Sequence, residues 1–173
     1  MELFQEIVSW QPKIPRRSIS YSDVERIYPI CFFDGASSGG DYECAVVLQF
    51  DLDVHFHFSW YGGRGHNGRA ELLALWGALQ CASLLGIDKI LIIGNSLSTI
   101  NWVKGISSHD VLDLYNWLLQ IMNFLPLIPE INFRHVYREQ NLEVDSLSTL
   151  GLSIFLGCWI GKSPLRIEAI PLV

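Results

Sequence analysis

The hydrophobic pattern changes within residues 69–96, which read RAELLALWGALQCASLLGIDKILIIGNS. From Arg69 to Leu85 the apolar residues recur three and four positions apart, which predicts an amphipathic helix that ends at Gly86. Lys89–Ile93 is a predicted strand whose residues after Lys89 are all apolar, typical of a strand that is covered on both faces. A helix followed closely by such a strand indicates an α/β domain.

The residues on either side extend this pattern. Before the helix, short runs rich in aromatic and β-branched residues predict a meander of three strands. After it, two helices, a fifth strand and a last helix closed by Gly151 are expected. The predicted strands are Tyr28–Asp34, Tyr42–Phe50, Val54–Trp60, Lys89–Ile93 and Ile131–Val136, and the later helices are Ser96–Lys104, Asp110–Phe124 and Asn141–Leu150.

The order of elements is therefore βββαβααβα, in one domain from residue 28 to residue 151. Residues 1–27 show no sustained periodicity and are interpreted as a lead-in segment. Residues 152–173 are apolar but poorly periodic, and we expect them to pack on the domain as a tail.

Composition narrows the class of protein. Half of the 173 residues are apolar, which is enough for one well-filled core. The formal charge of -6 argues against a strong nonspecific nucleic-acid binder, although a metal-dependent nuclease is itself locally acidic. The N-terminal residues lack the pattern of a signal peptide, and the longest apolar run is too short to span a membrane. We expect an intracellular protein, cytoplasmic or nuclear, with no membrane partner.

Three acids and one amide occupy notable positions in this order. Asp34 ends the first predicted strand, Glu71 lies in the first turn of the first helix, and Asp145 lies near the start of the last helix. Asn95 follows the fourth strand. An acid at a helix start is most often a cap, but these elements can converge at one edge of the sheet. Carboxylates held there could bind two magnesium ions that hydrolyse a phosphodiester.

Four ordered motifs resemble a ribonuclease H domain, and more narrowly the plant ribonuclease H-like domains of non-LTR retroelements. The motifs are Phe33-Asp34-Gly35-Ala36-Ser37, Asn67 to Leu75, Gly94-Asn95-Ser96 and His135 to Ser148. The resemblance implies a five-stranded mixed sheet of three antiparallel and two parallel strands flanked by helices. It also implies cleavage of the RNA strand of RNA–DNA hybrids with Mg²⁺ or Mn²⁺.

The family's functional residues can be carried over to this chain. The resemblance implies that Asp34, Glu71 and Asp145 are catalytic metal ligands, with Asp34 bridging both ions. The family has an Asp-Ser pair where this chain has Asn95-Ser96, so the third acid is replaced by an amide. Loss of that charge weakens the attraction for a divalent ion, although an amide oxygen can still coordinate one.

Further residues are candidates for auxiliary roles. His135 matches the place of a product-releasing histidine in some family members, or it simply forms a hydrogen bond at a strand end. The glycine-rich stretch from Gly62 to Gly68 could approach a nucleic-acid backbone or could be a flexible connection. Arg138 could contact a phosphate or pair with Glu139 or Glu143. The candidate nucleic-acid-binding residues are Ser37, Arg64, Asn67, Arg69, Arg138 and Asn141.

Three functional hypotheses follow from the sequence. The domain is an impaired nuclease that still binds RNA–DNA hybrid or structured RNA, a host-recruited module that binds a protein partner, or a slow but active ribonuclease H. The acidic balance and the apolar residues after Gly151 favour the protein-binding module. The sequence does not predict an oligomeric state.

Overall fold

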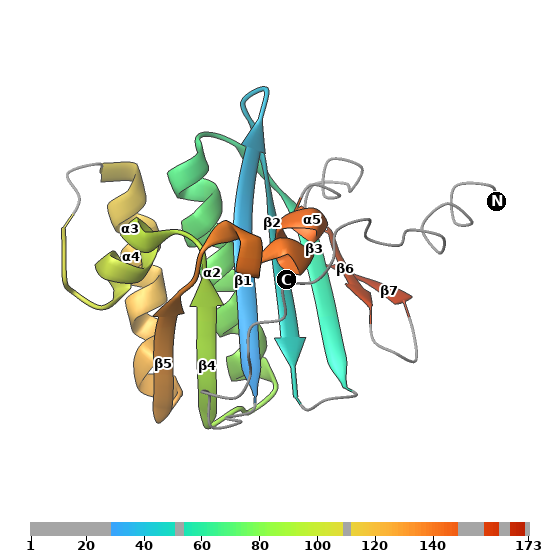
Figure 1. Cartoon of the computed structure of the whole chain (residues 1–173), viewed down its shortest axis with the longest axis vertical. Helices are drawn as coiled ribbons and strands as arrows, with labels where there is room; N and C mark the ends of the chain where they lie inside the picture. Colours follow the sequence, from blue (N-terminus) through green and yellow to red (C-terminus); the bar gives the residue numbers. More distant parts are fainter. Residues whose placement is uncertain (1–28, 51–53, 109–111, 149–157, 163–166, 172–173) are drawn as a thin grey trace.

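The computed structural model describes residues 29–50, 54–108 and 112–148, together with the backbone of residues 158–162 and 167–171. These residues form one mixed sheet in the strand order β5-β4-β1-β2-β3-β6-β7 (Figure 1). The strands are β1 (Ile30–Ser38), β2 (Asp41–Gln49), β3 (His55–Arg64), β4 (Lys89–Gly94), β5 (Glu130–His135), β6 (Cys158–Lys162) and β7 (Ile167–Pro171).

The first five strands confirm the predicted sheet. β1, β2 and β3 form an antiparallel meander, whereas β4 and β5 run parallel to β1. β4 is buried from Ile90 to Gly94, as its unbroken apolar character predicted. The β1–β2 hairpin extends beyond the end of β4 and carries the turn Gly39-Gly40, where both glycines have positive φ (Figure 1).

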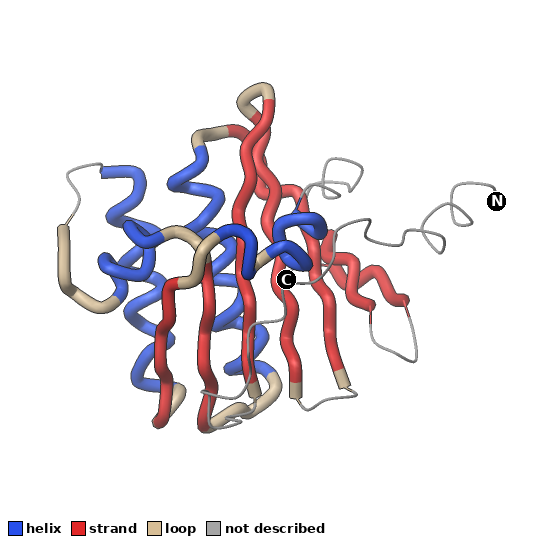
Figure 2. Tube along the Cα trace, viewed as in Figure 1, coloured by secondary structure: helices blue, strands red, loops and turns tan. Residues whose placement is uncertain are grey.

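Helices cover both faces of this sheet (Figure 2). α2 (Asn67–Leu84) and α4 (Leu112–Phe124) pack on one face, and their core includes Phe33 and Ile92 from the strands. α5 (Leu142–Ser148) packs on the other face, where Val144 joins a second core cluster. α3 (Leu97–Val103) and the short 3-10 helices η3 (Leu125–Leu127) and η4 (Arg138–Gln140) lie in the connections. No helix within the described ranges is long and apolar enough to cross a membrane.

Three sequence predictions need correction. Asp34 lies in the middle of β1 rather than at its end, because β1 continues to Ser38 in the hairpin with β2. Glu71 lies in the second turn of α2, since the helix begins two residues earlier than predicted. β3 extends to Arg64, so the expected glycine-rich connection is reduced to Gly65 and His66.

The described C-terminal backbone contains two strands that the sequence did not predict. β6 pairs antiparallel with β3, and β7 pairs with β6, so two strands extend the sheet beyond the predicted five. The sequence predicts no strand there because the apolar residues show no regular alternation. The lead-in segment, residues 1–27, lies outside the described residues, and the domain boundaries remain predictions.

Candidate functional site

Asp34 lies where the parallel part of the sheet ends. Phe33 of β1 is opposite Gly94, the last residue of β4, and Asp34 is the next residue along the strand. Its Cα partner on the other side is Ala45 of β2. The side chain of Asp34 is only 3% exposed. The strand thus holds a carboxylate inside the protein, next to the end of β4.

A close approach between α2 and β1 brings Glu71 to Asp34. A Cβ atom on Gly35 would lie 2.2 Å from the carbonyl carbon of Ala70 and 2.4 Å from the backbone nitrogen of Glu71. Only glycine therefore permits this contact. The backbone N–H of Gly35 donates a hydrogen bond to the Glu71 carboxylate, which is 5% exposed. The glycine that follows Asp34 thus also positions the second acid.

α5 supplies the third acid from the opposite face of the sheet. Its approach is held by Asn141, whose side-chain nitrogen donates to the carbonyl oxygen of Phe33 at 3.1 Å. The Ser148 hydroxyl lies 2.9 Å from Oδ2 of Asp34 and 2.8 Å from the carbonyl oxygen of Asp145. Asp145 and Arg138 both act electrostatically on Asp34 and Glu71. The structure therefore brings the three predicted acids together.

Burial dominates the electrostatics of the two inner acids. Burial raises the pKa of Glu71 well above its ordinary value, and the neighbouring negative charge of Asp34 raises it further. Burial also raises the pKa of Asp34, against hydrogen bonds from Ser148 and Asn95 that lower it. Both carboxylates are thus held in an environment that disfavours their charged forms.

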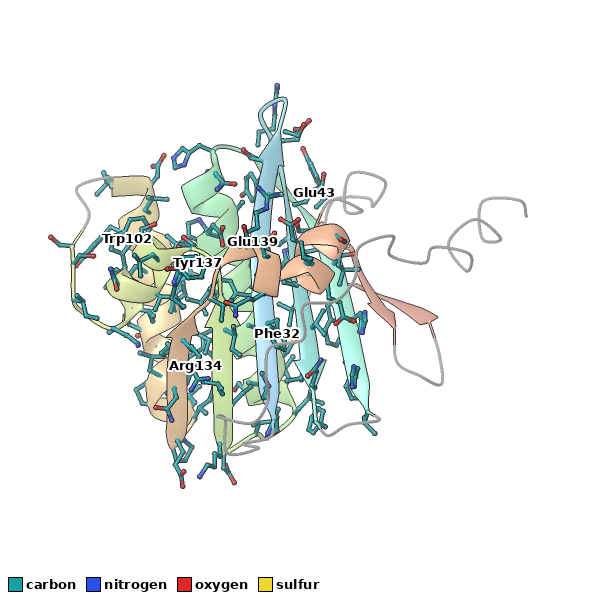
Figure 3. The ribbon with its side chains drawn as sticks, in the orientation of Figure 1. Phe32, Glu43, Trp102, Arg134, Tyr137 and Glu139 are labelled. Carbon is teal, nitrogen blue, oxygen red and sulfur yellow. The ribbon has the colours of Figure 1, made fainter. Side chains whose placement is uncertain are left out.

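Arg138 is the cation of the site. Its Nε and Nη2 atoms lie 2.8 Å and 2.6 Å from Oδ1 of Asp145. This bond raises the pKa of Arg138, so the guanidinium stays charged. The sequence left open a pair with Glu139 or Glu143, and the structure instead places the guanidinium on Asp145. Glu139 lies with Tyr137 on the connection from β5 to α5 (Figure 3).

Asn95 lies beside Asp34, as its place after β4 predicted. Its side chain lowers the pKa of the Asp34 carboxyl, and its Oδ1 atom accepts from Nδ2 of Asn141 at 3.4 Å. His135 ends β5, and its Nε2 atom lies 3.2 Å from the carbonyl oxygen of Asn95. His135 therefore has a hydrogen-bond partner at the end of its strand, which is one of the two roles predicted from the sequence. Its role in product release remains a prediction.

The donor set can be tested against a pair of divalent ions. Within the described residues, no group of three or more His, Cys, Asp or Glu side chains is arranged to hold a metal ion. Oε2 of Glu71 is buried and has no hydrogen-bond partner among the described residues. An unpartnered carboxylate oxygen of this kind would suit one cation. However, the guanidinium of Arg138 is bound to Oδ1 of Asp145, and the amide nitrogen of Asn95 is available to donate to Asp34. In this arrangement the side chains do not fit a two-metal site.

The candidate nucleic-acid-binding residues fall into different environments. Ser37, Arg64 and Asn67 are exposed near the hairpin and the start of α2, and Arg64 lies 3.7 Å from Asp41. Arg69 is half-buried, with its guanidinium 5.8 Å from the centre of the Tyr42 ring. Asn141 is 2% exposed, and its amide donates within the protein. The amide of Asn141 therefore has partners inside the protein, and its contact with nucleic acid remains a prediction.

Sequence reasoning assigned no role to Ser148 or to the backbone of Gly35. Ser148 stands three residues after Asp145, one helical turn along α5, and this spacing is the only sequence signal of its role. Gly35 follows Asp34 directly, and a glycine inside a strand often marks a close backbone approach. Both residues act on the acids through hydrogen bonds that depend on how the helices pack.

Comparison with known proteins agrees with this geometry. Residues 44–151, more than half of the chain, match the model of the reverse transcriptase-like family. The chain belongs to this family. The comparison with curated proteins found no match. The predicted resemblance to a ribonuclease H-like domain of the retroelement type is confirmed, and a plant origin remains a prediction.

Solved ribonuclease H structures share the fold. RNase H1 from the archaeon Halobacterium salinarum superposes with a TM-score of 0.66 at 26% identity, covering 72% of this chain and 96% of that one. The N-terminal RNase H domain of a Mycobacterium tuberculosis protein gives 0.64 at 22% identity, covering 72% and 94%. LC11-RNase H1 in complex with an RNA/DNA hybrid gives 0.63 at 24% identity, covering 70% and 94%. The shared fold is that of the five-stranded sheet with its helices.

Proposed function

We propose that this domain binds RNA–DNA hybrids or structured RNA and cleaves them weakly or not at all. The observation that carries the proposal is Asn95, an amide in the group formed by Asp34, Glu71 and Asp145 on a ribonuclease H-like fold. One structural relative, LC11-RNase H1, is described in complex with an RNA/DNA hybrid. The substrate class therefore has support from the fold, and the impairment has support from the site.

The chemistry of the family explains why the amide matters. Two divalent ions, when bound, activate a water molecule and stabilise the leaving oxygen of the phosphodiester. In this chain Arg138 already pairs with Asp145, so Asp34, Glu71 and Asp145 as they are arranged do not fit such a pair of ions, and Asn95 contributes no charge toward them. Because Oδ1 of Asn95 accepts from Asn141, its nitrogen is the atom left to face Asp34, and it would compete with a cation for an oxygen of that carboxylate. Both effects lower the occupancy of the site by metal.

A cleavage assay tests the impairment. We expect wild-type protein to show little cleavage of the RNA strand of a hybrid in Mg²⁺ or Mn²⁺. Asn95→Asp restores a carboxylate, and we expect it to raise the rate by at least about tenfold, corresponding to roughly 1.4 kcal/mol of transition-state stabilisation. Wild-type cleavage at ordinary enzyme rates, lost in Asp34→Asn, would show instead that the domain is an active ribonuclease H.

A binding assay tests the hybrid as ligand. Arg64 is an exposed cation at the end of the sheet where the site lies, and we expect Arg64→Gln to weaken hybrid binding. The slope of log affinity against log salt should fall by about 1, as for the loss of one phosphate contact. Lys89→Gln is the matched control, because Lys89 is an exposed cation at the opposite end of β4, paired with Glu130.

Binding data also separate this proposal from the protein-interaction alternative. A hybrid affinity that is weak and independent of salt, together with a protein partner captured after nuclease treatment, would favour a host-recruited interaction module. An affinity that falls steeply with salt and responds to Arg64 supports the nucleic-acid-binding domain.

A further inference from the structure

The side-chain oxygen and nitrogen of Asn95 each face a polar group of the site. Its Oδ1 atom accepts from Nδ2 of Asn141 at 3.4 Å, so the nitrogen is the amide atom left to face the neighbouring Asp34, whose carboxylate can only accept. The oxygen faces Nδ2 of Asn141, which also donates to the carbonyl oxygen of Phe33. These partners set the orientation of the amide, since the reverse orientation would place oxygen against oxygen and nitrogen against nitrogen. An aspartate at position 95 could not donate to Asp34 and would repel it.

Arg138 donates to the carboxylate of Asp145. Two nitrogen atoms of its guanidinium contact the same oxygen, Oδ1, at 2.8 Å and 2.6 Å. The positive charge also acts on Asp34 and Glu71. Arg138 therefore supplies a positive charge that belongs to the protein itself rather than to a bound ion. This charge offsets the repulsion between the carboxylates, which would otherwise disfavour their close packing.

Each carboxylate of the site has a donor from the protein. Asp34 has Asn95 and the Ser148 hydroxyl, Asp145 has Arg138, and Glu71 has the backbone N–H of Gly35. Asp34 and Glu71 are almost fully buried, so their placement without such donors would be costly. The side chains that stand in the way of a two-metal site are thus the same ones that hold the carboxylates.

We propose that Asn95 and Arg138 replace metal ions as the structural counter-groups of this site, so that the domain folds and keeps its carboxylates together without Mg²⁺ or Mn²⁺. Both are positioning residues that act through Asp34 and Asp145. The inference rests on the site of the proposed function, but it concerns the protein without nucleic acid.

Thermal unfolding of the full chain tests this inference. We expect the midpoint of the wild-type protein to be the same, within about 1 °C, in EDTA and in millimolar Mg²⁺ or Mn²⁺. In EDTA, Asn95→Asp should unfold about 5 °C lower, a shift that corresponds to one or two lost favourable interactions in a chain of this size. Millimolar Mn²⁺ should restore at least half of that loss, because the metal then binds the folded state selectively.

Asn132→Asp is the matched control for this change. Asn132 is exposed on β5, so the same chemical substitution there should leave the midpoint and its response to metal unchanged. Should Asn95→Asp fail to fold in either buffer, Arg138→Gln provides a second test at an exposed side chain, with Arg134→Gln on β5 as its control. We expect Arg138→Gln, but not Arg134→Gln, to acquire stabilisation by Mn²⁺.

Two results would overturn the inference. One is a rise of several degrees in the wild-type midpoint on addition of Mg²⁺ or Mn²⁺ without nucleic acid. The other is a midpoint for both Asn95→Asp and Arg138→Gln that equals the wild-type value in EDTA and does not respond to metal. Neither result bears on hybrid binding, and absence of hybrid binding would overturn the proposed function while leaving these melts unchanged.

Discussion

Replacement of Gly35 by alanine is expected to lower the free energy of unfolding by about 3 kcal/mol or more. The added Cβ would meet the carbonyl carbon and oxygen of Ala70 at 2.2 Å and 2.4 Å, and the nitrogen of Glu71 at 2.4 Å. These are backbone atoms of α2, so no side chain can rotate to make room. The helix must move away from β1 or the strand must bend.

The same change should disrupt the site. Moving α2 away from β1 separates Glu71 from Asp34 and breaks the hydrogen bond from the Gly35 N–H. Urea unfolding gives the stability change, and a lower midpoint with an unchanged slope would show that the folded state alone is affected. In the background of Asn95→Asp, we also expect Gly35→Ala to abolish any cleavage that the restored acid provides.

Gly68→Ala is the control for this substitution. Gly68 lies in the first turn of α2, and its nearest side-chain neighbours would be at 3.6 Å from an added Cβ, which is ordinary contact. Alanine is the better helix former, so Gly68→Ala should be neutral or stabilising by about 0.5–1 kcal/mol. A stable Gly35→Ala protein with a midpoint close to that of Gly68→Ala would contradict the close approach of α2 and β1.

Local hydrophobic pattern suffices to predict the buried strand β4 but not the extent of β1. Lys89–Ile93 was predicted correctly as a strand because Ile90–Ile93 is a continuous apolar run, as expected where a strand is covered on both faces. Asp34 was placed at a strand end because Gly35-Ala36-Ser37-Ser38 has the composition of a turn. In the fold these residues pair with β2 from Cys44 to Asp41, and cross-strand pairing prevails over local propensity.

Contacts between distant residues explain the rest. The orientation of Asn95 depends on Asn141, which lies 46 residues further along the chain, and the role of Ser148 depends on the approach of α5 to β1. Neither of these long-range contacts produces a periodic pattern in the sequence. The same holds for β6, whose pairing with β3 is set by the free edge of the meander. The sequence therefore predicted which acids meet, but not which protein groups hold them.

Glu71→Gln is expected to stabilise the folded protein by about 1–3 kcal/mol at neutral pH in the absence of metal. Glu71 is 5% exposed, its Oε2 atom has no hydrogen-bond partner within the described residues, and Asp34 repels its charge. A glutamine removes the buried charge and keeps an oxygen for the N–H of Gly35. Its amide nitrogen can also donate to a neighbouring carboxylate, which the glutamate cannot do when ionised.

The gain should depend on pH in a defined direction. Because burial raises the pKa of Glu71 in the folded state, the folded protein keeps a proton that the unfolded chain has already lost. The contribution of Glu71 to stability is therefore greatest below the ordinary glutamate pKa of about 4.3 and is lost as the pH rises through the higher folded pKa. Glutamine does not titrate, so the advantage of Glu71→Gln should grow over the same range.

Urea unfolding of both proteins in EDTA at several pH values measures this difference directly. Subtracting the wild-type stability from that of the variant removes the titration of groups that do not interact with Glu71, whereas Asp34 interacts with it, so the difference reports the two carboxyls together. Glu139→Gln serves as the control, since Glu139 is exposed and its replacement should change stability by less than about 0.5 kcal/mol at any pH. A Glu71→Gln protein less stable than wild type at neutral pH would mean that the ionised Glu71 is favourably held, and that the inner acids are better compensated than their burial implies.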